Sequence, residues 1–337
     1  MKGWQITSKG KICDFTKTDT GLSPSFAKVK IRKVLLTEND LLNYCENGDY
    51  YPIVPGRFAV GQVIETGANC FGHENGEKVY ISSTSPCKNC HNCKSDNEIN
   101  CSDFKIAGEN ANGNLVDFGI YPCELLYTLP KSVNDDAAIY IEYVALALSI
   151  IDKLNLSRAQ YVLIYGGNFF ANILAQLIIY YKSVPIIVDS DENNLLRAEQ
   201  DGIYYTLKTG ADLTRRISDL TGGRMCERVV YLSSPDNKPG VIFQLASHGG
   251  IMCISGFNAG KLNAPMTSAL KKQLSILSVN TGINNIASAI NALANKAVDF
   301  SRFKLRVEKF DDVPRLFKEL AEDYNADKNI EVLIDLI

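Results

Sequence analysis

The sequence lacks the features that mark membrane and secreted proteins. No run of about eighteen apolar residues occurs, and the most apolar stretch, 173–181, is half that length, so we expect no membrane span. The opening residues, MKGWQITSKGK, lack the apolar segment of a secretion signal. We therefore expect a cytoplasmic protein. The chain also has no tandem repeat and no low-complexity tract.

An excess of basic residues is absent as well. The chain has 35 Lys and Arg against 38 Asp and Glu, a net charge of −3 and a pI near 5.8. Sequence-independent binding to nucleic acid requires clustered Lys and Arg that displace counterions, so we predict no nucleic-acid partner. A hydrophobic fraction of 46% is ordinary for a globular protein, and 337 residues favour two domains.

Histidine is scarce, with three residues, whereas cysteine is plentiful, with ten. Four cysteines follow the spacing C-x2-C-x2-C-x7-C, and these are Cys87, Cys90, Cys93 and Cys101. Four thiolates complete a tetrahedral zinc shell and leave no open position, so this zinc would be structural. Two disulfides or four unrelated thiols are the alternatives, although disulfides suit a secreted chain. A nucleic-acid-binding zinc ribbon is disfavoured because the loop has no net basic charge.

The other six cysteines are scattered singly along the chain, and we assign them no chemistry: Cys13, Cys45, Cys70, Cys123, Cys226 and Cys253. No other stretch of the sequence offers a second metal site.

The two parts of the chain differ in predicted secondary structure. In the first 130 residues, short strands are expected at 27–34, 58–66 and 77–82, separated by Gly and Asn clusters, which indicates an irregular antiparallel domain. From about residue 132, apolar strands alternate with helices, which predicts an α/β fold with a doubly wound parallel sheet. The expected helices are 135–154, 172–182, 192–201, 212–221, 240–247, 284–296 and 313–324, and the expected strands are 160–165, 185–188, 228–232, 250–255, 274–279 and 330–337.

A possible dinucleotide-binding turn follows the strand at 160–165. The G-x-G-x-x-G pattern is represented by Gly166, Gly167, Asn168, Phe169, Phe170 and Ala171, so only the first glycine of the pattern is present. Asn tolerates positive φ and Ala adds one methyl, so the turn survives. However, Asn168 places a side chain where the phosphates approach.

Asp189 ends the second strand of this βαβ unit. An acidic residue at this point accepts hydrogen bonds from the adenosine ribose and repels a 2′-phosphate, which favours NAD over NADP. The alternative is that Asp189 only caps the helix expected from Glu192.

Taken together, the sequence resembles the zinc-containing medium-chain alcohol and polyol dehydrogenases over essentially its full length. The motifs that carry the resemblance are the four-cysteine lobe, VPGRFAVGQVIETG (54–67), GEKVYI (76–81), ENANGNLVDFGI (109–120), YVLIYGGNFFANILAQL (161–177) and ASHGGIMCISG (246–256). The resemblance implies a GroES-like catalytic domain at 1–130 and 281–337, with the zinc lobe at about 86–102. It also implies a Rossmann domain at 131–280 and assembly into a homodimer or homotetramer.

The chain departs from this family at the catalytic zinc. Thr37 stands at the family's Cys position, Arg57 at its His position, and only Glu142 matches the third ligand. Zinc needs about three protein donors, and an arginine repels a dication, so we predict no catalytic zinc. We expect Arg57 to pair with Glu142 or Asp40, either as a structural ion pair or as a charge that polarises a carbonyl.

The sequence thus predicts an NAD(H)-dependent oxidoreductase that acts on an alcohol/carbonyl pair of a small molecule without a catalytic zinc. The resemblance suggests a polyol or sugar derivative as the substrate. The alternative is a catalytically inactive dehydrogenase relative that serves as a nucleotide-binding or subunit-pairing protein. The metal ligands and the glycines are altered, and Asn39 stands where the resemblance implies a Ser or Thr hydroxyl that passes the proton.

Overall fold

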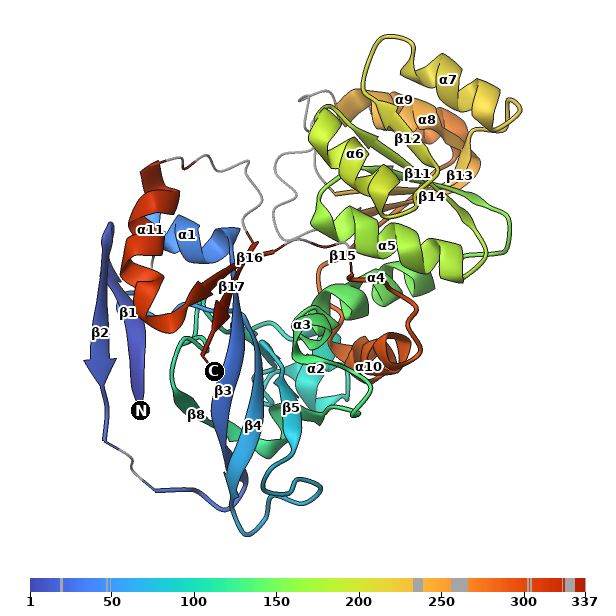
Figure 1. Cartoon of the computed structure of the whole chain (residues 1–337). Helices are drawn as coiled ribbons and strands as arrows, with labels where there is room; N and C mark the ends of the chain where they lie inside the picture. The colour runs from blue at the N-terminus through green and yellow to red at the C-terminus, as the bar shows by residue number, and fades with distance from the viewer. Residues whose placement is uncertain are drawn as a thin grey trace. The chain divides into compact units, whose positions relative to one another are not determined.

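The structure is a computed structural model of the whole chain (Figure 1). It describes residues 1–18, 21–46, 48, 50–232, 239–255, 266–301, 303, 305–322, 324 and 331–336. The chain forms two compact units, Met1–Glu142 with Phe303–Ile337, and Tyr143–Arg302. Within the described residues, no helix is both long and apolar enough to cross a bilayer.

The first unit is built on an irregular, mostly antiparallel sheet. Its strands run in the order β16-β17-β3-β4-β5-β9, with β8 paired to β3, and β1 and β2 form a separate hairpin. The strands are β1 Lys2–Ser8, β2 Lys11–Thr16, β3 Phe26–Thr37, β4 Phe58–Thr66, β5 Lys78–Ile81, β6 Thr84–Ser85, β7 Lys105–Ile106, β8 Phe118–Pro122, β9 Leu126–Thr128, β16 Arg306–Lys309 and β17 Glu331–Asp335. The helices are α1 Glu38–Cys45, α2 His91–Lys94, η1 Glu98–Asn100, η2 Cys123–Leu125, α3 Asp135–Ala138, η5 Phe310–Asp312 and α11 Val313–Glu322.

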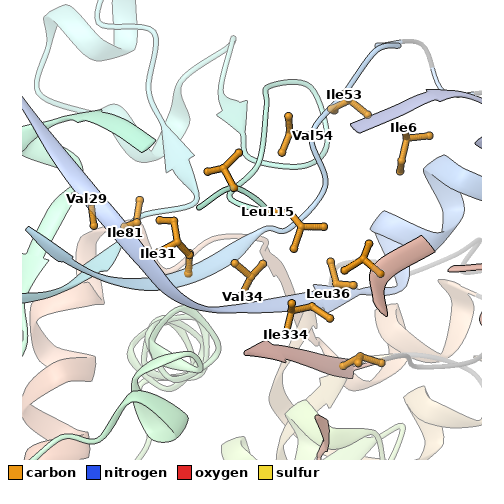
Figure 2. Packing of buried hydrophobic residues seen from close by; sticks show 14 of the residues in the cluster. Ile6, Val29, Ile31, Val34, Leu36, Ile53, Val54, Ile81, Leu115 and Ile334 are labelled. Carbon is orange, nitrogen blue, oxygen red and sulfur yellow. The ribbon is translucent and has the colours of Figure 1, made fainter. Parts of the chain in front are cut away.

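Strand β3 organises the core of this unit. Its buried apolar residues change parity, from Val29 and Ile31 to Val34 and Leu36, because the register with β4 shifts between Ile31 and Lys33. An extra residue at such a bulge keeps both stretches facing the same core. Figure 2 shows these four side chains in one cluster with apolar residues from other segments, namely Ile6, Ile53, Val54, Ile81, Leu115 and Ile334.

The second unit is the expected doubly wound parallel sheet. All its neighbouring strands are parallel, in the order β12-β11-β10-β13-β14-β15, which is the 3-2-1-4-5-6 order of the Rossmann fold. The strands are β10 Tyr161–Tyr165, β11 Val184–Asp189, β12 Tyr205–Lys208, β13 Cys226–Tyr231, β14 Ala246–Ser255 and β15 Ser275–Val279. The helices are α4 Ile141–Leu154, α5 Phe169–Tyr180, α6 Glu192–Gln200, α7 Leu213–Leu220, η3 Pro239–Val241, α8 Ile242–Leu245, α9 Met266–Lys272, η4 Ile283–Asn285 and α10 Ile286–Ala294.

The unit boundaries differ from the expected ones at 130 and 280. Residues 131–142 belong to the first unit, because Asp135 accepts hydrogen bonds from Arg32 and Lys78 of that unit's sheet. Helix α10 belongs to the second unit and not to the first. The reason is that Asn285, just before α10, donates hydrogen bonds to Ser149 and Asp152 of α4.

Several elements were not predicted from the sequence. The β1–β2 hairpin, helix α1 and strand β12 are short, and their apolar residues show little periodicity. Helix α1 packs on α11 (Figure 1). The Tyr44 ring of α1 lies 5.2 Å from the Phe317 ring of α11. The predicted helix 135–154 is divided into α3 and α4. Residues 256, 323, 330 and 337 of the predicted segments lie outside the described residues.

Candidate functional site

The four cysteines of the lobe converge. Their Sγ atoms all lie within 4.8 Å of one another, and this is the one group of potential metal ligands found among the described residues. The Sγ atoms of Cys87 and Cys93 are 3.9 Å apart. Zinc–sulfur bonds of about 2.3 Å in a tetrahedron place two sulfurs about 3.8 Å apart, so the geometry fits a single zinc ion.

Backbone amides surround these sulfur atoms. Cys87 N donates to Cys101 Sγ at 3.3 Å, Cys90 N to Cys87 Sγ at 3.3 Å, Cys93 N to Cys90 Sγ at 3.4 Å, and Asp103 N to Cys101 Sγ at 3.4 Å. Such donors stabilise negative charge on sulfur, as a thiolate shell requires. The four cysteines are all free of disulfides. The lobe would therefore hold a metal in a closed shell that leaves no position for a substrate.

A disulfide occurs elsewhere in the same unit. Cys70, in the turn between β4 and β5, is bonded to Cys123 of η2, with Cα atoms 5.6 Å apart. Our assignment of no chemistry to these two cysteines was therefore wrong. They are 53 residues apart in sequence, and only the sheet brings their segments together. Because disulfides are rare in reducing compartments, the cytoplasmic location stays a prediction.

Asp40 is buried at the start of α1, and its carboxylate is used by its own unit. Oδ2 accepts from Thr37 N at 2.8 Å and from Thr37 Oγ1 at 3.3 Å, while Oδ1 accepts from Gly56 N at 2.7 Å. Only 1% of Asp40 is exposed. Burial raises the pKa of Asp40 from 3.8 to about 6, although these hydrogen bonds and the charge of Arg57 act in the opposite direction. Asp40 thus ties the start of α1 to the loop that carries Arg57.

Glu142 is also engaged by hydrogen bonds. Its Oε1 accepts from Ser83 N at 2.6 Å, and its Oε2 accepts from the Ser83 hydroxyl. Ser83 was not among the predicted site residues, because no local pattern links it to a residue 59 positions away. The two hydrogen bonds fix both oxygens of the Glu142 carboxylate.

Arg57 is buried in the same unit, and it has an ion-pair partner that we did not predict. Its Nη1 lies 3.6 Å from Glu109 Oε2, and its guanidinium lies 5.4 Å from the centre of the Phe58 ring. The charges of Arg57 and Glu142 both act on buried Tyr80. Burial raises the pKa of this tyrosine well above its ordinary value, Glu142 raises it further, and Arg57 lowers it. The first unit therefore gathers Arg57, Glu142 and Tyr80 into one buried charged region.

The turn after β10 lies at the carboxyl end of the parallel sheet, in the second unit. Gly166 has φ of +104°, which a side chain would strain, and a Cβ on Gly167 would lie 3.0 Å from the Asp189 side chain. Asp189 Oδ2 accepts from Gly167 N, and its Oδ1 accepts from Asp191 N at 2.8 Å. The helix cap of α6 is Asp191 and not Asp189, so the alternative reading of Asp189 as that cap was wrong.

Asn168 and Ala171 complete the turn in a way that the sequence argument did not foresee. Asn168 has φ of −66° and ψ of 179°, so tolerance of positive φ is not why this residue fits. It is the N-cap of α5, and its Oδ1 accepts from Ala171 N at 2.9 Å. The glycine turn and Asp189 fit the ribose half of a dinucleotide, whereas the Asn168 side chain stands at the helix end that would receive the pyrophosphate.

Comparison with known proteins agrees with this architecture. Residues 23–131 match the family "Alcohol dehydrogenase GroES-like domain". A Haemophilus influenzae protein named "Uncharacterized zinc-type alcohol dehydrogenase-like protein" is 24% identical over 274 residues, which cover 81% of this chain and 80% of that protein. A sorbitol dehydrogenase of Halalkalibacterium halodurans is 25% identical over 259 residues, which cover 74% and 75%.

The fold also has close structural matches. A crystal structure described as a short chain alcohol dehydrogenase of E. coli CFT073, complexed with cofactor NADH, has a TM-score of 0.86 and 19% identity, and covers 100% of this chain and 99% of that one. These comparisons show a likeness to zinc-type alcohol dehydrogenase-like proteins, and the family match covers residues 23–131 of this chain. They confirm the α/β fold with a GroES-like domain and a Rossmann-like domain.

Proposed function

We propose that this chain is an NAD(H)-dependent oxidoreductase of the alcohol dehydrogenase type, with one structural zinc and no catalytic zinc. Its substrate is an alcohol/carbonyl pair of a small molecule, and the sorbitol dehydrogenase relative favours a polyol or sugar derivative. We further propose a cytoplasmic homodimer or homotetramer.

The observation that carries the cofactor assignment is the position of Asp189. It ends β11 at the carboxyl edge of the sheet and is tied to Gly167 of the turn after β10. Ligands of doubly wound sheets bind at this edge, near the point where the strand order reverses. A carboxylate there accepts hydrogen bonds from a ribose diol and repels a 2′-phosphate, so NAD(H) is favoured over NADP(H).

The absence of a catalytic zinc is supported by the engaged carboxylates. Asp40 accepts from Thr37 and Gly56, and Glu142 accepts from Ser83 at both oxygens. Arg57 adds a fixed positive charge to the same unit, and such a charge opposes binding of a dication.

Arg57 is the residue of this region best suited to act on a substrate. The bound nicotinamide would supply or accept the hydride, so the protein need only orient the reactants and stabilise charge on the substrate oxygen. A guanidinium in a buried region, where interactions with charge are strong, performs the second task without a metal. Its partner Glu109 and the Asp40 contact to Gly56 keep the Arg57 loop in place.

The proposal is tested on the purified full chain by zinc analysis and by titration with NADH and NADPH, followed by fluorescence. We expect one zinc per chain, tighter binding of NADH than of NADPH, and turnover in a screen of polyols and sugars. Asp189→Asn should weaken NADH binding about tenfold or more, because one charged acceptor is lost. Two zinc ions per chain would refute the proposed absence of a catalytic zinc. One zinc without any nucleotide binding would favour the inactive relative.

The role of Arg57 is tested by two substitutions. Arg57→Gln removes the charge, whereas Arg57→Lys keeps it. If the charge acts on the substrate, Arg57→Gln should lower kcat about a hundredfold and Arg57→Lys should retain part of the activity. Equal loss of stability in both variants, with unchanged kcat, would instead identify a structural ion pair.

A further inference from the structure

At the start of α5, the side chain of Asn168 lies where a phosphate of the cofactor would be expected. Asn168 Oδ1 accepts from Ala171 N at 2.9 Å, and the Asn168 carbonyl accepts from the same amide at 3.0 Å. Amides in the first turn of a helix attract anions, and the Ala171 amide is shared between the carbonyl and the side chain of Asn168. The carboxamide oxygen therefore occupies a donor that suits a pyrophosphate oxygen.

A second amide of the turn is also engaged. Gly167 N donates to Asp189 Oδ2, and Asp189 is 3% exposed. Two of the backbone donors in this turn thus have acceptors supplied by the chain itself. Asp189 is held from two sides, by Gly167 and Asp191, so it is fixed in place.

Among the residues at the start of α5, Asn168 has the side chain that can move. Phe169 and Phe170 are buried, and the Tyr143 ring lies 6.3 Å and 5.9 Å from their rings. Asn168 is half-buried. Because φ of −66° is accessible to every residue, its side chain can rotate or be removed without changing the backbone of the turn.

We propose that Asn168 is an affinity-setting residue that competes intramolecularly with the pyrophosphate of the dinucleotide. This inference rests on the proposed NAD(H) function. The Asn168 carboxamide caps α5 in the free protein, and cofactor binding requires it to release Ala171 N. The cofactor must therefore overcome a helix cap, and affinity is lowered by the strength of that cap, about five- to tenfold.

The test compares the full-length wild type with Asn168→Gly, and uses NADH and adenosine as probes. Glycine removes the side chain and is itself tolerated at helix N-caps. We expect Asn168→Gly to bind NADH about five- to tenfold more tightly. Adenosine, which has no phosphate, should bind both proteins equally. Asn168→Asp should cap the helix equally well but weaken NADH binding, because a carboxylate repels the pyrophosphate.

The chain offers a matched control in Asn134, the N-cap of α3, whose side chain accepts from Ala137 N at 2.8 Å. Asn134→Gly should leave the NADH affinity unchanged. A second readout is thermal: saturating NADH should raise the Tm of Asn168→Gly more than that of the wild type.

The outcomes separate this inference from the proposed function. If wild type and Asn168→Gly bind NADH equally, the inference fails and the NAD(H) function stands. If only Asn168→Gly binds, the inference is supported and native NAD(H) use is refuted. If neither protein binds NADH, both the inference and the NAD(H) function are refuted, because no cofactor binds with which Asn168 could compete. If Asn168→Gly gains as much affinity for adenosine as for NADH, the inference is also overturned, because the phosphates would not be involved.

Discussion

The buried carboxylate of Asp40 should make the stability of the first unit depend on pH. Burial raises the pKa of Asp40 from 3.8 to about 6, a difference of about 2.2, and each unit corresponds to about 1.4 kcal/mol. The folded state thus favours the protonated acid by about 3 kcal/mol relative to the unfolded chain. Asp40 is 1% exposed, so solvent screening does not reduce this free-energy difference.

The sign follows from which state holds the proton. Below pH 3.8 Asp40 is protonated in both states, and its contribution to stability is largest. Between pH 3.8 and about 6 the unfolded chain loses the proton first, so stability falls as the pH rises. Above pH 6 the acid is ionised in both states, and the loss is complete.

Comparison with Asp40→Asn isolates this effect. Asn has nearly the same shape and does not titrate, so effects of pH on other groups, such as the cysteine lobe, cancel in the difference. The free energy of unfolding of the wild type minus that of Asp40→Asn should fall by about 3 kcal/mol from well below pH 3.8 to pH 7. Urea denaturation at several pH values, followed by fluorescence, measures it.

The control is Glu65→Gln, which makes the same carboxylate-to-amide change at an exposed position on β4 of the same unit. The reasoning is refuted if the Asp40→Asn difference is the same at pH 4 and pH 7, or if it rises with pH. A rise would mean that the hydrogen bonds from Thr37 and Gly56 outweigh burial.

Two further predictions concern the cysteines. Cys93→Ala should abolish the zinc content of the purified protein and make the segment between Cys87 and Cys101 sensitive to protease. The control variant Cys45→Ala, outside the lobe, should retain the metal. Zinc bound by Cys93→Ala would contradict the four-sulfur site. Cys123→Ser removes a cross-link between residues 53 apart and should lower the free energy of unfolding by about 2–4 kcal/mol, measured by urea denaturation without reductant. Dithiothreitol should destabilise the wild type and not Cys123→Ser, and an equal effect on both would argue against the disulfide.

Features encoded by local spacing were predictable from the sequence. The lobe cysteines are close in the chain, so a short turn brings their sulfurs together. The alternation of strands and helices around Asp189 likewise indicated the parallel sheet, because each βαβ unit forms from neighbouring residues. In the same turn, we predicted that Asn168 fits because it tolerates positive φ. In the structure its φ is negative, and its side chain caps helix α5.

The partners of the site residues were not predictable, because each joins segments remote in the chain. Ser83 meets Glu142, Arg57 meets Glu109, and Cys70 meets Cys123 only after the sheet has formed. Sequence by itself determined the fold class and the convergence of the four lobe cysteines, since these depend on residue type and on neighbours in the chain. Tertiary structure alone decided which groups meet Glu142 and Arg57, because a buried charge takes whichever partners folding brings within reach.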